Sequence, residues 1–560
     1  MWYALAYFMG VIMQNKPNVN IYEDGSKMWS HTFENFIAKV YIPASRIKDD
    51  VINYGFAAPY LLIFEENEMD EPAAKSYADG NGLASIASTY GSSVVFIYPT
   101  CNGGWENATE DLYKELIANS KIHECYEDGY AILNNRFTKS CDGYAIRGAI
   151  FRTFLFGKGK SADFIAGNLI KTVEGEGLWG PADVAPTACV LEGLSDKPVV
   201  GRKDMPIVSI GNSLDINEYI MDAVEDCYID ATANYPVIFD EFLKHYKRWG
   251  WVGTLEESPD FAELGMNEEM VVETLKTSPD NMSKDKDLPE HKVGYIAYYN
   301  KKIFDKGPAP LLLCFHGGGD SAMYISQVSE WYRVAHDYDF LLICVEDHLN
   351  STATEMIELL DKLSARYSID RSRVYATGFS MGGCKTWDIY QEYPEYFAAL
   401  APMDATFDVG CNVYGKKVDK EINCDIRVPV FYVGGEETPL PELPFQAQKC
   451  MDRMEYVLKV NRAQKAEEYS KLKLVDAKSW ENKIWGLNGN RVEIISDPSR
   501  GSELTLQYFD SEDDECYCVF GSVSGQGHEC RHHTCEQAWK YMSKFSRPVP
   551  CTGALSCGTP

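Results

Sequence analysis

Basic residues are scarce in this 560-residue chain. Lys and Arg number 53 against 83 Asp and Glu, which gives a formal net charge of −30. Nucleic acids and anionic membrane surfaces attract positively charged proteins, so this balance argues against both as natural partners. The charge otherwise indicates a soluble protein, and no substrate is inferred from it. We therefore expect neither nucleic acid nor a membrane among the partners.

The apolar opening of the chain, Met1 to Met13, lacks the features of a spanning or targeting segment. It is too short to cross a bilayer, which takes about 20 residues. It also lacks a basic n-region and a clear cleavage site. We expect a cytoplasmic protein; secretion is the alternative if a signal peptide preceded this sequence.

The chain has 17 cysteines, an odd number, so not all of them can pair in disulfides within it. Cys314 and Cys344 lie in apolar runs that predict core strands, where free cysteine behaves as a small hydrophobic residue. These features favour a reducing compartment. The length predicts more than one domain, and 45% apolar residues fit an ordinary globular protein.

Strand and helix signals alternate through both halves, which predicts an α/β fold with two tandem lobes. Each lobe is expected to hold a mainly parallel sheet flanked by helices. Three pairs of segments keep the same order in the two halves: 58–64 with 309–315, 94–98 with 341–345, and 205–211 with 428–434. We interpret this order as a tandem duplication; a shared fold class without common ancestry is the alternative. A polar stretch, Ser278 to Pro289, predicts the boundary between domains 1–285 and 286–560.

The segment Gly378-Phe-Ser-Met-Gly382 lies between a strand signal and a helix signal. This is the context of a nucleophile elbow, in which a tight turn lifts a serine hydroxyl above the edge of the sheet. The glycines suit a strained turn and a helix packed close to the strand. We predict that Ser380 is a nucleophile; an ordinary turn serine is the alternative.

A serine nucleophile also needs donors for the oxyanion of the tetrahedral intermediate. His316-Gly-Gly-Gly319 follows a predicted strand, and its glycines leave backbone N–H groups open to a substrate. We predict the N–H groups of Gly318 (or Gly317) and Met381 as donors. A plain glycine-rich turn is the alternative.

The general base is predicted to be His528, on the loop Ser524-Gly-Gln-Gly-His528 after the last strand signal. His532 and His533 are rivals. The run from His528 to Cys535 also raises the alternatives of a structural zinc, whose standard spacing it does not match, and of a Cys530–Cys535 disulfide.

The acid that orients the base is predicted in the loop Gly434-Gly-Glu-Glu-Thr438. Glu437 is our assignment and Glu436 the next choice, since a carboxylate after this strand would come second, between Ser380 and His528, in the chain order Ser, acid, His. Asp404, after the preceding strand, is a third alternative.

The first half lacks these groups at the corresponding places. Gly159 stands at the nucleophile position, and Glu65 to Glu68 stand opposite the glycine run. Gly159-Lys-Ser161 also looks like the end of a phosphate-binding loop, but that motif needs a glycine where Phe154 stands. We expect a hydrolase-like lobe that is catalytically silent.

Residues 290–560 resemble the esterases that include feruloyl esterases, acetyl xylan esterases and poly(3-hydroxybutyrate) depolymerases. The resemblance rests on segments 316–319, 373–383, 393–402 and 525–528. It implies an α/β-hydrolase serine esterase without a metal or organic cofactor, acting on a small or polymer-attached ester. Alternatives are a serine peptidase of this fold and a non-catalytic binding protein, and a homo-oligomer stays open.

One stretch of the second half, near 440–514, departs from this resemblance as an insertion. We expect it to form a lid over the pocket, where Trp480 and Trp485 would contact an aromatic acyl group. His316 is also assigned to substrate binding. Packing of the insertion's own small core is the alternative for the two tryptophans.

Overall fold

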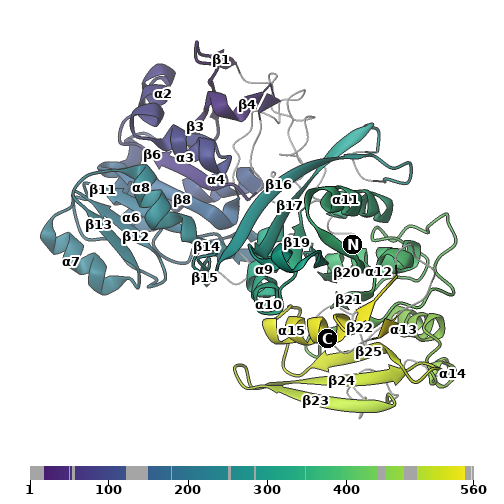
Figure 1. Ribbon diagram of the computed structural model, residues 1–560. Coiled ribbons are helices and arrows are strands. Elements are labelled where there is room, and N and C mark those ends of the chain that lie inside the picture. Colours follow the sequence, from purple (N-terminus) through teal and green to yellow (C-terminus); the bar gives the residue numbers. More distant parts are fainter. Residues whose placement is uncertain are drawn as a thin grey trace. The chain divides into compact units, whose positions relative to one another are not determined.

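The computed structural model describes residues 18–48, 51–52, 57–121, 149–177, 180–249, 254–282, 286–318, 320–346, 348–438, 448–471, 488–548 and 556–557. The chain forms two compact units, Met1–Pro259 and Asp260–Pro560 (Figure 1). Among the residues described, no helix has the length and apolar character needed to cross a membrane.

Unit 1 is built on a nine-stranded sheet. Its order is β1 (Val19–Ile21), β2 (Lys27–Thr32), β3 (Phe36–Ile42), β7 (Val94–Pro99), β6 (Tyr60–Phe64), β8 (Thr153–Lys158), β11 (Ala188–Glu192), β12 (Ile207–Ile210) and β13 (Cys227–Asp230). The strands from β7 to β13 run parallel, and β1 to β3 are antiparallel additions at one edge. The parallel strands are short apolar runs, as expected for a sheet that is covered on both faces.

Helices cover both faces of this sheet, and each face has its own core. One core includes buried side chains of α4 (Glu110–Lys121), α6 (Lys160–Asn168) and α7 (Leu214–Ala223). The other includes those of α2 (Glu71–Gly80), α3 (Leu83–Tyr90) and α8 (Tyr235–Glu241). Three strand pairs lie outside the main sheet: β4 (Ile47–Lys48) with β5 (Val51–Ile52), β9 (Glu174–Gly177) with β10 (Gly180–Asp183), and β14 (Tyr246–Trp249) with β15 (Thr254–Glu257).

Unit 2 is built on a ten-stranded sheet (Figure 1). Its order is β16 (Met266–Lys276), β17 (Glu290–Asn300), β19 (Leu341–Val345), β18 (Ala309–Phe315), β20 (Ile369–Phe379), β21 (Ala399–Met403), β22 (Val430–Gly435), β25 (Cys516–Val523), β24 (Ser502–Asp510) and β23 (Arg491–Asp497). The six strands from β19 to β25 run parallel, and each edge carries two antiparallel strands. Both units therefore have the predicted α/β class.

The helices of unit 2 follow the same alternation with the strands. They are α9 (Ala322–Val328), α10 (Trp331–Tyr338), α11 (Ala353–Arg366), α12 (Met381–Glu392), α13 (Gln448–Val460), α14 (Ala466–Tyr469) and α15 (His532–Met542). A last strand pair, β26 (Phe545–Ser546) with β27 (Ser556–Cys557), lies near the chain end.

The described part of the predicted insertion, 448–471 and 488–514, holds α13, α14, β23 and β24. Its two strands extend the main sheet beyond β25. Trp480 and Trp485, which we predicted near the substrate, lie outside the described residues.

The segments aligned between the two halves occupy equivalent places in the two sheets. Strands β3-β7-β6-β8-β11-β12 of unit 1 follow the same order as β17-β19-β18-β20-β21-β22 of unit 2. The predicted pairs 58–64 with 309–315 and 94–98 with 341–345 are β6 with β18 and β7 with β19. Common descent of the units stays a prediction.

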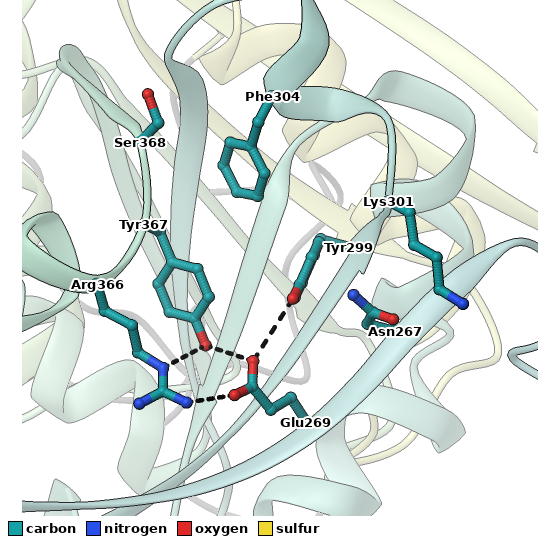
Figure 2. A pocket seen from close by; sticks show the side chains of 8 residues that line it. All are labelled: Asn267, Glu269, Tyr299, Lys301, Phe304, Arg366, Tyr367 and Ser368. Carbon is teal, nitrogen blue, oxygen red and sulfur yellow. Dashed lines mark hydrogen bonds and ion pairs between the residues drawn. The ribbon is translucent and has the colours of Figure 1, made fainter.

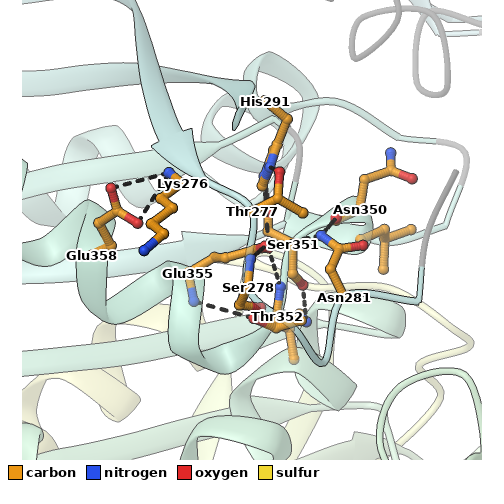
Figure 3. Close-up of polar contacts among 12 residues, drawn as sticks. Lys276, Thr277, Ser278, Asn281, His291, Asn350, Ser351, Thr352, Glu355 and Glu358 are labelled. Carbon is orange, nitrogen blue, oxygen red and sulfur yellow. Dashed lines mark hydrogen bonds and ion pairs between the residues drawn. The ribbon is translucent and has the colours of Figure 1, made fainter. Parts of the chain in front are cut away.

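The boundary between the units lies at Pro259/Asp260, earlier than the predicted 285/286. The polar stretch that suggested a linker lies inside unit 2, because β16 pairs with β17 along its whole length. A buried network holds this hairpin to α11 (Figure 3). The Glu355 carboxylate accepts hydrogen bonds from the Ser278 N–H at 2.7 Å and from Asn281 Nδ2 at 3.0 Å, and it caps the helix through the Thr352 N–H at 2.7 Å. The polar residues Ser278 and Asn281 of this stretch therefore belong to a buried hydrogen-bonded cluster and not to a linker.

Candidate active site

Ser380 lies in a sharp turn between the strand β20 and the helix α12, as the sequence predicted. Its backbone is strained, with φ 53° and ψ −119°, a conformation that residues with a side chain rarely adopt. The Ser380 N–H donates to the Met403 carbonyl at 3.0 Å, which ties the turn to the end of β21. The turn is thus held in place by the neighbouring strand.

The two outer glycines of the turn are required by close packing. A Cβ atom at Gly378 would collide with the backbone of Gly382, and one at Gly382 would collide with the backbone of Phe315 on β18. Any side chain at these positions would push α12 away from the sheet. The predicted close packing of the helix on the strand is therefore confirmed.

His528 follows β25 and lies beside the serine turn. Its ring packs on the ring of Phe379, the residue before Ser380, with the centroids 4.6 Å apart. Burial lowers the pKa of His528 to about 4, since desolvation penalises the imidazolium. The ring is therefore neutral near pH 7 and able to accept a proton.

The carboxylate that faces His528 belongs to Asp404. Asp404 Oδ2 lies 3.8 Å from His528 Nδ1, and both atoms are buried without a hydrogen-bond partner. The other carboxylate oxygen, Oδ1, accepts from the Gly435 N–H at 2.9 Å. Burial raises the pKa of Asp404 above its ordinary value. A small shift would close the 3.8 Å gap to a hydrogen bond, the contact by which an acid orients an imidazole.

This geometry corrects the predicted acid. Glu437 is exposed, and Glu436 Oε1 accepts from Ser522 Oγ at 2.9 Å. Gly435 packs against the backbone of Gln526 and Gly527, and the Glu437 N–H donates to the Gln526 carbonyl at 2.9 Å. Asp404 was only the third alternative in the sequence. In the sequence, its signal is its place directly after the strand β21, which pairs with β20. In the structure, Asp404 also has a left-handed φ of 47°, which is uncommon for a non-glycine residue.

The glycine loop after β18 carries one of the predicted oxyanion donors, Gly318; Gly319 lies outside the described residues. The Gly317 carbonyl accepts from the Asp320 N–H at 3.3 Å and lies 2.8 Å from His316 Nδ1. In a trans peptide, the N–H group of the next residue points away from this carbonyl. The Gly317 carbonyl points toward Asp320 and His316. The Gly318 N–H therefore points away from these two residues.

Met381, which carries the other predicted donor, is the first residue of α12. The first N–H groups of a helix have no partner within it, so the Met381 N–H is available to a bound anion.

His316 is fully buried, which corrects its assignment to substrate binding. Its Nε2 atom lies 2.8 Å from the Glu346 carbonyl, and burial lowers its pKa to about 4. The Glu346 carboxylate in turn accepts from the Ala322 N–H at 2.7 Å, at the start of α9. His316 thus links the glycine loop to the Glu346 backbone through its ring nitrogens.

The rival histidines, His532 and His533, are the first two residues of α15. His532 begins α15, and its Nδ1 atom lies 3.6 Å from the Glu330 carboxylate. Cys530 and Cys535 are free thiols with sulfurs 3.4 Å apart, and Cys530 Sγ also lies 3.3 Å from Met403 Sδ.

The equivalent turn of unit 1 keeps the backbone shape without the hydroxyl. Gly159, between β8 and α6, has φ 57° and ψ −126°, close to the angles of Ser380. A Cβ atom there would lie 2.8 Å from Glu66 Oε2. The position aligned with Ser380 from the sequence therefore has the same local structure, and an acidic side chain borders it.

No family model matches the sequence. A bifunctional acetylxylan esterase/xylanase of Neocallimastix patriciarum is 29% identical over 136 residues, which is 23% of this chain and 19% of that protein. Poly(3-hydroxyalkanoate) depolymerase C of Paucimonas lemoignei is 25% identical over 114 residues, which is 17% of this chain and 27% of that protein. The chain thus spans only a minor part of the length of both relatives.

Two solved structures with partial matches are an esterase and a hydrolase. An acetyl xylan esterase of Aspergillus awamori matches 49% of this chain and 99% of its own, with 14% identity and a TM-score of 0.33. An S-formylglutathione hydrolase of Agrobacterium tumefaciens matches 49% and 95%, with 12% identity and a TM-score of 0.30. Over a minor part of its length, the sequence is similar to an acetylxylan esterase/xylanase and to a poly(3-hydroxyalkanoate) depolymerase.

Proposed function

We propose that this protein is a serine carboxylic-ester hydrolase that acts through an acyl-enzyme on Ser380. The observation that carries the proposal is the convergence of three groups at one edge of the unit 2 sheet. Ser380 follows β20, Asp404 follows β21, and His528 follows β25 and packs against the serine turn. Carboxyl ends of parallel strands meet at one edge, which is where such folds bind ligands.

In the first half of the proposed reaction, Ser380 Oγ attacks the ester carbonyl carbon while His528 accepts the hydroxyl proton. The oxyanion is stabilised by the N–H groups of Gly318 and Met381. The tetrahedral intermediate then collapses, the bond to the alcohol oxygen breaks, and His528 gives its proton to that oxygen. Asp404 faces the imidazolium formed in between and offsets its charge.

In the second half, water attacks the acyl-enzyme and His528 accepts a proton from it. Collapse of the second intermediate returns that proton to Ser380 Oγ and releases the carboxylic acid. One water is consumed for each ester cleaved. No metal or organic cofactor enters these steps.

The substrate class that we propose is an acetyl, feruloyl or hydroxyalkanoate ester. The names of the two curated relatives, an acetylxylan esterase and a poly(3-hydroxyalkanoate) depolymerase, support the first and last of these. We propose that unit 1 takes no part in the chemistry, since Gly159 has no nucleophile to offer.

Hydrolysis of p-nitrophenyl acetate by Ser380→Ala tests the proposal. The matched control is Ser368→Ala, because Ser368 precedes β20 as Ser380 follows it and is exposed. We expect kcat to fall by roughly 10³ or more in Ser380→Ala and to stay within about twofold in Ser368→Ala. Equal activity of the folded Ser380→Ala protein and the wild type would rule out the mechanism.

A further inference from the structure

A cavity of about 610 Å³ lies at the other end of β20 from Ser380 (Figure 2). Three segments line it: the start of β16, the end of β17 with the connection to β18, and the end of α11 with the connection to β20. Arg366 and Tyr367 precede the 11-residue strand β20, whereas Ser380 follows it. A strand of this length spans roughly 35 Å, so the cavity is separate from the candidate active site.

Three aromatic rings form the apolar wall of the cavity. The rings of Phe304 and Tyr367 are nearly parallel, with an interplanar angle of 14° and centroids 6.4 Å apart. The Tyr299 ring meets Tyr367 edge-on, at 5.8 Å and 67°. Phe304 and Tyr299 are only partly buried, so ring surface remains exposed to a ligand. Such walls favour a flat, apolar body that can stack on the rings.

The carboxylate of Glu269, the acidic group of the cavity, already accepts hydrogen bonds from neighbouring side chains. Glu269 pairs with the Arg366 guanidinium and accepts hydrogen bonds from the Tyr367 hydroxyl at 2.9 Å and the Tyr299 hydroxyl at 3.5 Å (Figure 2). Three donors therefore converge on one carboxylate. Glu269 has little capacity left for the donors of a ligand.

One cationic group of the cavity, Lys301, has no described carboxylate partner. Among the described residues, no carboxylate lies within ion-pair distance of the Lys301 ammonium, which lines the cavity beside the aromatic wall. Lys301 and Arg366 against Glu269 leave a local excess of positive charge in a chain whose net charge is −30. This local excess favours an anion, and the ammonium can form a charge-assisted hydrogen bond with it.

We propose that this cavity binds an aryl carboxylate, with the aromatic ring of the ligand on the wall of Tyr299, Phe304 and Tyr367 and its carboxylate on Lys301. A few polar groups beside an apolar wall are typical of small-molecule sites, and the volume lies within their usual range. The site does not depend on the proposed esterase reaction.

Calorimetric titration of the full chain with benzoate tests this site, with benzamide as the neutral probe of the same shape. We expect saturable binding of benzoate, weakened about fivefold or more in Lys301→Gln because the charge pair is lost. The matched control is Lys302→Gln, since Lys302 is the next residue, is exposed and does not line the cavity. Its affinity should equal that of the wild type.

Two further variants complete the test. Phe304→Ala should also weaken benzoate binding, because part of the stacking wall is removed. Ser380→Ala should leave it unchanged, which separates this cavity from the candidate active site whether or not Ser380 is a nucleophile. The proposal is overturned if benzoate shows no saturable binding up to about 20 mM. It is equally overturned if Lys301→Gln binds as the wild type does, or if benzamide binds as tightly as benzoate.

Discussion

Asp404 is the residue whose role most separates the structure from the sequence. Its carboxylate is buried 3.8 Å from His528, whereas Glu437 is exposed. We predict that Asp404→Asn lowers kcat/KM by roughly 10²–10⁴, because the imidazolium loses its compensating charge and its orientation. Glu437→Gln, the matched change at the originally assigned residue, should stay within about twofold. Ester hydrolysis by the two purified variants decides between them, and the reverse ranking would restore Glu437.

The protonation of His528 sets the expected pH dependence. Burial lowers its pKa to about 4, so the neutral base persists to a lower pH than in an exposed histidine. We predict that kcat/KM falls only as the pH drops below the ordinary histidine value of about 6.5. A pH–rate profile measures this acid limb, with circular dichroism at each pH to show that the chain remains folded. An acid limb at or above pH 7 in the folded protein would contradict the burial of His528.

At the residue scale, the sequence predicted Ser380 and His528, which local motifs mark. It did not predict the acid, which no local motif marks. Ser380 is marked by its glycines, whose packing admits no side chain. His528 is marked by a glycine-containing loop after the last parallel strand. The acid carries no such local motif. Its position depends on tertiary contacts at the sheet edge, where Asp404 accepts from the Gly435 N–H and faces His528.

At the scale of elements, the hairpin β16–β17 is held to α11 by the buried carboxylate of Glu355. We predict that Glu355→Ala lowers the free energy of unfolding by about 3 kcal/mol, since buried N–H donors lose their acceptor. Glu358→Ala is the matched control, because Glu358 lies one turn further along the same helix and accepts from the exposed Lys276 N–H (Figure 3). It should cost less than about 1 kcal/mol. Chemical unfolding measures both, and similar losses in the two variants would count against the buried network.

Most elements could be predicted from alternating apolar segments, and the predicted segments 58–64, 94–98, 309–315 and 341–345 correspond to β6, β7, β18 and β19. The domain boundary and the edge strands β23 and β24 could not. The polar stretch near Ser278 has the composition of a linker, and only the burial of Asn281 and Glu355 shows that it is folded into unit 2. Likewise, β23 is largely exposed along its length, so it carries little of the apolar signal of a core strand.

At the scale of the whole molecule, two units share a strand order but differ at the turn where chemistry is proposed. We predict that adding Gly159→Ser to Ser380→Ala does not restore esterase activity. The new side chain would stand next to the Glu66 carboxylate, whose negative charge opposes the formation of an oxyanion. Hydrolysis of p-nitrophenyl acetate by the double variant and by Ser380→Ala alone measures this. Activity regained by the double variant would show that unit 1 retains a working site.

The central claim is that Ser380 is an activated nucleophile, and covalent labelling tests it most directly. The intact protein is treated with a fluorophosphonate, digested, and mapped by mass spectrometry. We predict one adduct per chain, on Ser380, with labelling slowed in His528→Ala because the serine loses its base. Absence of an adduct on Ser380 in folded protein, or labelling at an unchanged rate without His528, would contradict the account.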